Sequence, residues 1–128
     1  MNDTEKITIN LSAVDLGKVD LLVQEALYSN RTDFIKTAIR NQLERHSEEV
    51  GQAVTRHSFV VGVLIYDSKE LLGYRARGEK LNISVVGLLR LQNDIDASLA
   101  LDVIESIKVR GMLDMPGELK EALKDRIR

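Results

Sequence analysis

The chain has 128 residues, of which 44% are hydrophobic and 30% charged, and this length and balance predict one ordinary domain or two very small ones rather than a large enzyme with separate cofactor and substrate domains. Its net charge of −2 excludes indiscriminate binding to polyphosphate, which depends on a clustered excess of Lys and Arg. The absence of cysteine excludes disulfides, thiolate metal sites and cysteine nucleophiles.

The chain begins with the polar stretch MNDTEKITIN, which lacks the apolar core of a secretion signal. No later stretch approaches the roughly 20 apolar residues that a membrane span needs. We therefore expect a cytoplasmic protein with no membrane partner.

Residues 6–12, KITINLS, alternate between apolar and polar side chains, which predicts a short half-buried strand. Three apolar side chains share one face of this strand and three polar ones share the other: Ile7, Ile9 and Leu11, against Lys6, Thr8 and Asn10. Only helical sequence follows, without a hairpin signal. Because a lone strand is not stable, we expect it to pair with a strand of another chain.

A first helix is predicted from Ala13 to about Leu27, with Ser12 as its N-cap and Asp15 in the position of a capping-box residue. Its apolar residues recur at helical spacing: Leu16, Val19, Leu22, Val23 and Ala26.

A second helix is predicted to begin at Thr32 as its cap and to run to about Arg45. Its apolar stripe consists of Phe34, Ile35, Ala38, Ile39 and Leu43. Gly51 is the next strong helix breaker, so residues 47–56 are predicted to form a linker or an extension of the helix.

The remaining residues carry an internal repeat, Val-x-Gly-apolar-Leu, centred on Gly62, Gly87 and Gly111 at separations of 25 and 24 residues. Each copy has the composition of a strand and precedes a helical segment, at Ser68 to Arg77, Ala97 to Ser106 and Glu118 to Arg126. This order predicts parallel strands joined by crossovers, either as a βαβαβα layer or as a three-turn solenoid. A glycine at one register of every strand would let neighbouring backbone approach closely.

The strand and two helices at the start of the chain resemble the ribbon-helix-helix family typified by CopG, Arc and MetJ. The resemblance is carried by KITINLS, VDLGKVDLLVQEAL and NRTDFIKTAIRNQLERH, within residues 6–46. The last segment is the most specific, because members often carry Arg-Ser-Glu-Phe-Ile-Arg or a close variant where residues 31–36 of this chain read Arg-Thr-Asp-Phe-Ile-Lys.

The resemblance implies a homodimer whose two ribbons pair antiparallel and enter the major groove of double-stranded DNA. Lys6, Thr8 and Asn10 would then contact bases. The N-terminus of the second helix would hold a backbone phosphate, through Asn30, Arg31, Thr32 and Asp33.

Two departures from the family pattern concern this same region. No glycine separates the two helices, so Asn30 or Ser29 is expected to take the left-handed turn. Asp33 lies beside the expected phosphate site, where its negative charge repels the ligand although it favours the helix N-terminus. Independently of these departures, residues 1–46 hold six Lys or Arg against seven Asp or Glu, and this net charge of −1 speaks against a DNA-binding module.

The predicted fold class is therefore α+β. We expect a ribbon-helix-helix domain over residues 1–46, the linker or helix extension over 47–56, and an α/β repeat domain over 57–128. Sequence-specific regulation of transcription is the preferred function. The alternatives are an assembly or partner-binding protein that uses the ribbon only to dimerise, and an antitoxin-type regulator. A tetramer or larger assembly through residues 57–128 is left open. A small-molecule effector there is left open as well, because Tyr66, Tyr74, Arg75 and Arg77 could either line a pocket or be ordinary surface residues.

Neither an enzymatic activity nor a cofactor or metal is expected. The chain lacks a phosphate-binding loop, a Gly-x-Ser-x-Gly motif and a His-Glu-x-x-His motif. His46 and His57 are its only histidines. Residues 94–105 have the ligand spacing of a calcium-binding loop, but Leu99 occupies the position that requires glycine.

Overall fold

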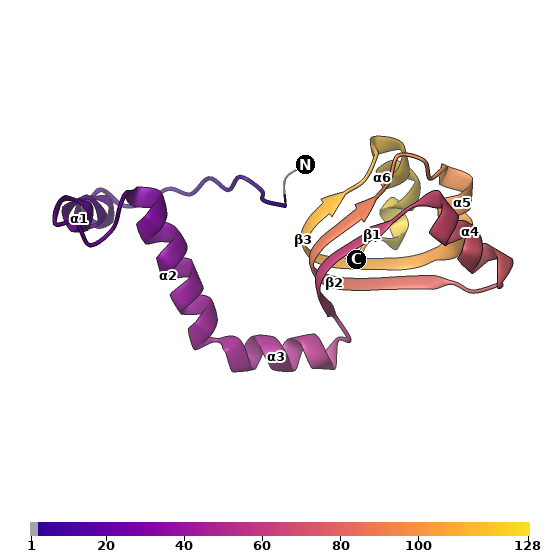
Figure 1. Ribbon diagram of the computed structural model, residues 1–128, viewed down its shortest axis with the longest axis horizontal. Coiled ribbons are helices and arrows are strands. Elements are labelled where there is room, and N and C mark those ends of the chain that lie inside the picture. Colours follow the sequence, from indigo (N-terminus) through magenta and orange to yellow (C-terminus); the bar gives the residue numbers. More distant parts are fainter. Residues whose placement is uncertain (1–2) are drawn as a thin grey trace. The chain divides into compact units, whose positions relative to one another are not determined.

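The computed structural model describes residues 3–128, which divide into two compact units (Figure 1). The first extends to Gln52 and the second covers Ala53–Arg128. The first unit contains α1 (Ala13–Gln24), α2 (Arg31–Arg45) and the beginning of α3 (Ser47–Arg56). Both helices predicted in residues 13–45 are thus present.

The predicted cap of α1 is confirmed, because the Ser12 hydroxyl accepts a hydrogen bond of 3.1 Å from the Asp15 amide. The helix ends earlier than expected, at Gln24. Amide-to-carbonyl bonds from Ala26 to Val23 and from Leu27 to Leu22 form a Schellman motif, which places Ala26 in the left-handed region at φ 62°.

The predictions that Asn30 or Ser29 takes the left-handed turn, and that Thr32 caps α2, are both wrong. Asn30 has an extended backbone, φ −165°, and its side chain accepts a 2.8 Å bond from the Asp33 amide. This bond makes Asn30 the cap, so the helix begins one residue before Thr32. The turn therefore occurs directly behind α1, at Ala26, and not in front of α2.

Residues 47–56 were predicted to form either a linker or an extension of the second helix. They form neither, but the separate helix α3. The predicted break at Gly51 does not occur, since a glycine inside a helix costs only about 1 kcal/mol relative to alanine.

The strand predicted over residues 6–12 is not formed in the single chain, because residues 4–12 belong to no helix or strand. A strand is defined by hydrogen bonds to a neighbour, and no segment of the described residues pairs with this one.

The second unit has the predicted βαβαβα order. It consists of β1 (Val60–Tyr66), α4 (Ser68–Ala76), β2 (Leu81–Leu91), α5 (Ala97–Val103), β3 (Ile104–Asp114), α6 (Gly117–Leu123) and the 3₁₀ turn η1 (Lys124–Arg126). The three strands are parallel in the order β1-β2-β3, as expected. The helix predicted to reach Ser106 stops at Val103, because Ile104 already pairs with Leu81 in the sheet.

The repeated glycines form one row across the sheet, with Gly87 paired to both Gly62 and Gly111. All three have positive φ, between 130° and 142°. A Cβ atom on Gly87 would overlap the carbonyl oxygen of Gly62, and a Cβ atom on Gly111 would overlap that of Gly87. The expected close approach of neighbouring backbone at these glycines is therefore confirmed.

The core of this unit lies between one face of the sheet and the three helices (Figure 1). Alternate residues of β2 point into it, including Ile83, Val85 and Leu89. Each helix contributes buried leucine, at Leu71 in α4, Leu99 in α5, and Leu119 and Leu123 in α6. The parallel sheet is thus anchored to its crossover helices on one side.

Replacement of the central glycine, Gly87→Ala, is expected to destabilise the second unit more than Gly62→Ala. Both substitutions force a side chain into a positive-φ conformation, at roughly 1–3 kcal/mol. Only the change at Gly87 also meets a backbone carbonyl, which adds about 1–3 kcal/mol. Urea unfolding followed by circular dichroism measures both, and equal midpoints would contradict the prediction.

Ala26→Gly is expected to stabilise α1 by roughly 0.5–1 kcal/mol, because relief of the left-handed strain exceeds the entropy that glycine adds to the unfolded chain. Gly78→Ala is the matched reverse change, since Gly78 has φ 68° and space for a Cβ atom. It should destabilise α4 by a similar amount. Amide hydrogen exchange of the two helices measures the effects, and faster exchange of α1 in Ala26→Gly would refute the first.

Candidate nucleic-acid interface

The extended segment before α1 exposes both sets of its alternating side chains. Lys6, Thr8 and Asn10 are exposed, and none of them lines a groove described in this unit. The apolar residues between them are exposed as well, Ile7 by 80%, Ile9 by 58% and Leu11 by 43%.

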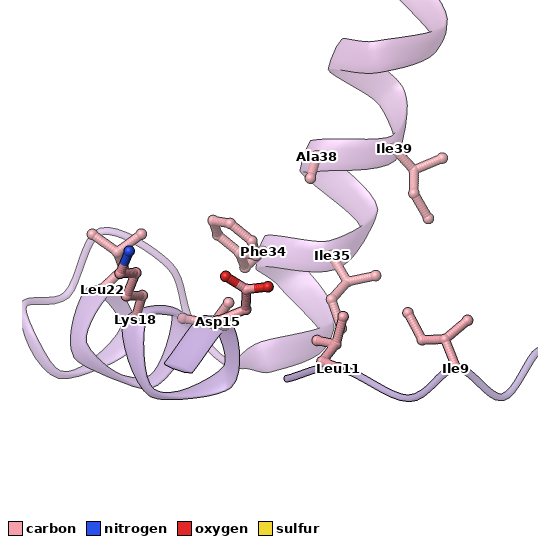
Figure 2. Close-up of a pocket in the computed structure, with 10 residues that line it drawn as sticks. Ile9, Leu11, Asp15, Lys18, Leu22, Phe34, Ile35, Ala38 and Ile39 are labelled. Atoms are coloured by element: carbon pink, nitrogen blue, oxygen red, sulfur yellow. The ribbon is translucent and has the colours of Figure 1, made fainter. Parts of the chain in front are cut away.

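An apolar groove of about 450 Å³ lies between this segment and the first two helices. Figure 2 shows Ile9 and Leu11 of the segment pointing toward Ile35 and Ile39 of α2. Ten residues line the groove: Ile9, Leu11, Asp15, Lys18, Val19, Leu22, Phe34, Ile35, Ala38 and Ile39. Six of the ten positions predicted to form the two apolar stripes line this groove: Val19, Leu22, Phe34, Ile35, Ala38 and Ile39.

The first unit leaves most of its apolar surface exposed. Val19 is the one fully buried hydrophobic residue of residues 3–52. The large hydrophobic side chains that stay exposed there are Ile7, Ile9, Leu11, Val14, Leu21, Leu27, Ile39, Leu43 and Val50. So little burial cannot offset the conformational entropy lost on folding.

The N-terminus of α2 brings together the four residues predicted to contact phosphate. The Asn30 side chain accepts from the Asp33 amide, and the Asp33 carboxylate accepts a 2.9 Å bond from the Ser29 amide. Thr32 is exposed in the first turn. Helix geometry gives the amides of Arg31 and Thr32 no acceptor within the helix, which leaves two donors at its positive end.

Arg31 is held by Asp20 of α1 through two parallel hydrogen bonds, from Nε at 2.8 Å and from one terminal nitrogen at 2.9 Å. The hydrogen bond from Arg31 holds the pKa of Asp20 below its ordinary value, and the positive charge of the guanidinium adds to this effect. The same pair raises the pKa of Arg31. The guanidinium is therefore fixed beside the start of α2 and keeps further N–H donors.

Sequence reasoning missed the role of Asp20. The two partners are 11 residues apart and lie on different helices, so no helical periodicity connects them. A bidentate pair across a helix-helix turn becomes visible only when the turn is built. The turn is further held by Tyr28, whose ring meets that of Phe34 edge to face at 5.0 Å.

The residues considered for an effector site in the second unit have partners within that unit. Tyr66 packs against the core, and burial raises its pKa. Arg75 pairs with Asp102 at 3.5 Å. Arg77 pairs with Glu79 at 3.2 Å and lies over the ring of Tyr74.

Residues 3–128 contain neither a candidate metal site nor a candidate membrane span. No group of three or more His, Cys, Asp or Glu side chains is arranged there to hold a metal ion. None of the helices in this range is long and apolar enough to cross a membrane.

The geometry defines a two-unit protein whose helical first unit presents an exposed apolar groove, lined in part by an extended arm of alternating apolar and polar side chains. A model of the ribbon-helix-helix transcriptional regulator family matches residues 2–120. The chain belongs to this family, and its function is accordingly of the transcriptional-regulator type, in a family that is generally non-enzymatic. No curated protein and no solved structure matched the chain.

The ion pair between α1 and α2 makes a prediction about pH. Because the folded-state pKa of Asp20 is depressed, the stabilisation from its ionised form is present above the ordinary pKa and is lost as pH falls through the lower, folded-state value. Arg31→Gln should raise the Asp20 pKa toward its ordinary value. A carbon-13 NMR titration of the Asp20 carboxyl group measures this shift. An unchanged Asp20 pKa would contradict the pairing.

Proposed function

We propose that this chain is a sequence-specific DNA-binding transcriptional regulator that works as a homodimer. The observation that carries the proposal is the extended arm, residues 6–12, whose apolar side chains border an unfilled groove while its polar side chains are free for another contact. An arm of this kind needs a partner strand on its edge and a partner surface against its apolar face.

A second copy of the chain supplies both. Two arms paired antiparallel around a two-fold axis satisfy each other's backbone, and their Ile7, Ile9 and Leu11 side chains would cover the grooves of both copies. The opposite face of the ribbon would then present two sets of Lys6, Thr8 and Asn10. A two-stranded ribbon fits the major groove, where Lys can donate to guanine and Asn can bond adenine through two atoms.

The start of α2 is proposed to position the ribbon on the DNA backbone. The amides of Arg31 and Thr32 and the positive end of the helix suit a phosphate oxygen. Asn30 and Asp33 would act by fixing this helix start, through the bonds described above. Arg31 would contribute the donors that Asp20 does not use. Such contacts fix orientation and carry no base sequence.

The proposal is tested by selection from a random pool of DNA duplexes at roughly 0.1–0.15 M salt, where non-specific binding is weak. The wild type should enrich a palindromic or tandem motif, because a symmetric dimer reads two half-sites. A variant with Lys6→Ala, Thr8→Ala and Asn10→Ala should enrich none while remaining dimeric in sedimentation. Enrichment of the same motif by this variant would refute base readout by the arm.

The proposed contact of Arg31 with a DNA phosphate is tested separately from base readout. Arg31→Ala should weaken binding to all sequences alike and reduce the salt dependence of the affinity, whereas Asn10→Ala should relax the preference at one position. If neither the wild type nor any variant enriches a sequence, the DNA proposal fails and the module is a dimeriser only.

A further inference from the structure

The second unit has one unguarded sheet edge, which is β1. In the order β1-β2-β3 this strand is outermost, so the backbone along its free side is unpaired. The strand reads VVGVLIY and contains no charged residue. Six large hydrophobic residues of this unit are exposed, and four of them lie on β1: Val60, Val61, Val63 and Ile65. The other two are Leu72 on α4, the helix that follows β1, and Leu101 on α5. Exposed apolar surface in this unit is therefore concentrated at one edge.

The opposite edge, β3, is guarded in two ways. Its sequence carries four charged residues, Glu105, Lys108, Arg110 and Asp114. The end of the chain also covers part of it, because Ile127 forms a bridge with Ile107 and the Arg128 amide donates a 2.7 Å bond to the Ile107 carbonyl. Charge and local covering are the means by which proteins prevent strand addition. The unit thus blocks addition at β3 and leaves it possible at β1.

Gly62 fits the same conclusion. Gly87 and Gly111 each need glycine, because the carbonyl of the preceding strand occupies the space of a Cβ atom. Gly62 has the same positive φ of 142°, although nothing lies within 4 Å of its Cβ position. The backbone at the free edge therefore keeps the conformation that admits a close neighbour, and the single chain provides no neighbour.

We infer that β1 pairs with β1 of a second copy of this chain, antiparallel and around a two-fold axis. The pairing joins two three-stranded sheets into one six-stranded sheet with the helices of both copies on the same face. Two uncharged strands meet without like-charge repulsion. Since each copy has one open edge and one guarded edge, the pairing closes on itself instead of growing into a fibre. It is independent of the ribbon proposed for DNA binding.

Two-fold symmetry restricts which residues of the two β1 strands can lie opposite each other. Residues opposite one another in a sheet point to the same face, so in a two-fold antiparallel pair one residue of β1 must lie opposite its own copy. The Cα atoms of such a pair are about 4.5–5.5 Å apart, which lies within the range of Cα separations that a disulfide spans.

The absence of cysteine in the chain makes the test direct. Full-length variants with one cysteine each, one for every position of β1 from Val60 to Tyr66, are oxidised under mild conditions, and their masses are measured under denaturing conditions. One position should shift most of the protein to the mass of two chains, and its neighbours should do so far less. Arg110→Cys on β3 is the control for random collision and should stay single. Equal crosslinking at all positions, or none on β1, would overturn the inference.

A head-to-tail arrangement, with β3 of one copy beside β1 of the next, is a distinguishable outcome. Because Val61, Val86 and Arg110 share one row, that arrangement predicts ladders of crosslinked chains in the double variant Val61→Cys/Arg110→Cys. Ladders there without crosslinking of any single variant would overturn the two-fold pairing.

A charge on the edge should remove the pairing. Val63→Lys is added to the β1 cysteine variant that crosslinks best, and it should abolish the crosslink. If that variant is Val63→Cys, then Val61→Lys is added instead. Leu101→Lys changes a similarly exposed residue away from the edge and should leave the crosslink intact. DNA selection with Val63→Lys separates the two proposals. Lost crosslinking with retained motif enrichment is expected, whereas crosslinking that persists in Val63→Lys would refute pairing through β1.

Discussion

Every residue of an extended backbone has an N–H and a C=O group that need hydrogen-bond partners, and this requirement shapes both units of the protein. In the second unit the partners come from the sequence repeat, which lays three strands side by side in register. In the first unit, none of the residues that the structure describes forms a strand beside the extended arm. The same physical requirement is therefore met by a folded sheet in one unit and left unmet along the extended arm of the other.

The first unit compensates for its small size with local bonds at the helix ends. Ser12 and Asn30 cap α1 and α2, and the bidentate pair between Asp20 and Arg31 ties the two helices together across the turn. These polar contacts lie at the surface, where an ion pair contributes little stability. They define the direction of the helices, whereas the apolar groove between the arm and the two helices remains exposed.

Electrostatics of the first unit also bear on how it would meet DNA. With a net charge of −1 over residues 1–46, the module has no broad positive field, so attraction to phosphate must come from a few placed donors. Asp33 lies in the first turn of α2, and Asp20 of α1 pairs with Arg31 at the start of that helix. Both carboxylates order the donors there and at the same time reduce the local positive charge. In the proposed complex this arrangement favours sequence readout by the ribbon over non-specific adhesion.

The sequence by itself determined what depends on short-range pattern: the alternating arm, two helices, the Ser12 cap, the parallel βαβαβα order and the glycine register. Alternation, helical spacing and repeats at 24 or 25 residues can be recognised in the sequence alone. Tertiary structure alone decided the left-handed Ala26, the cap at Asn30 and the pairing of Asp20 with Arg31. It also decided which sheet edge is open, because the covering of β3 by Ile127 joins residues 20 positions apart. Such features depend on where the chain returns in space, which no local pattern encodes.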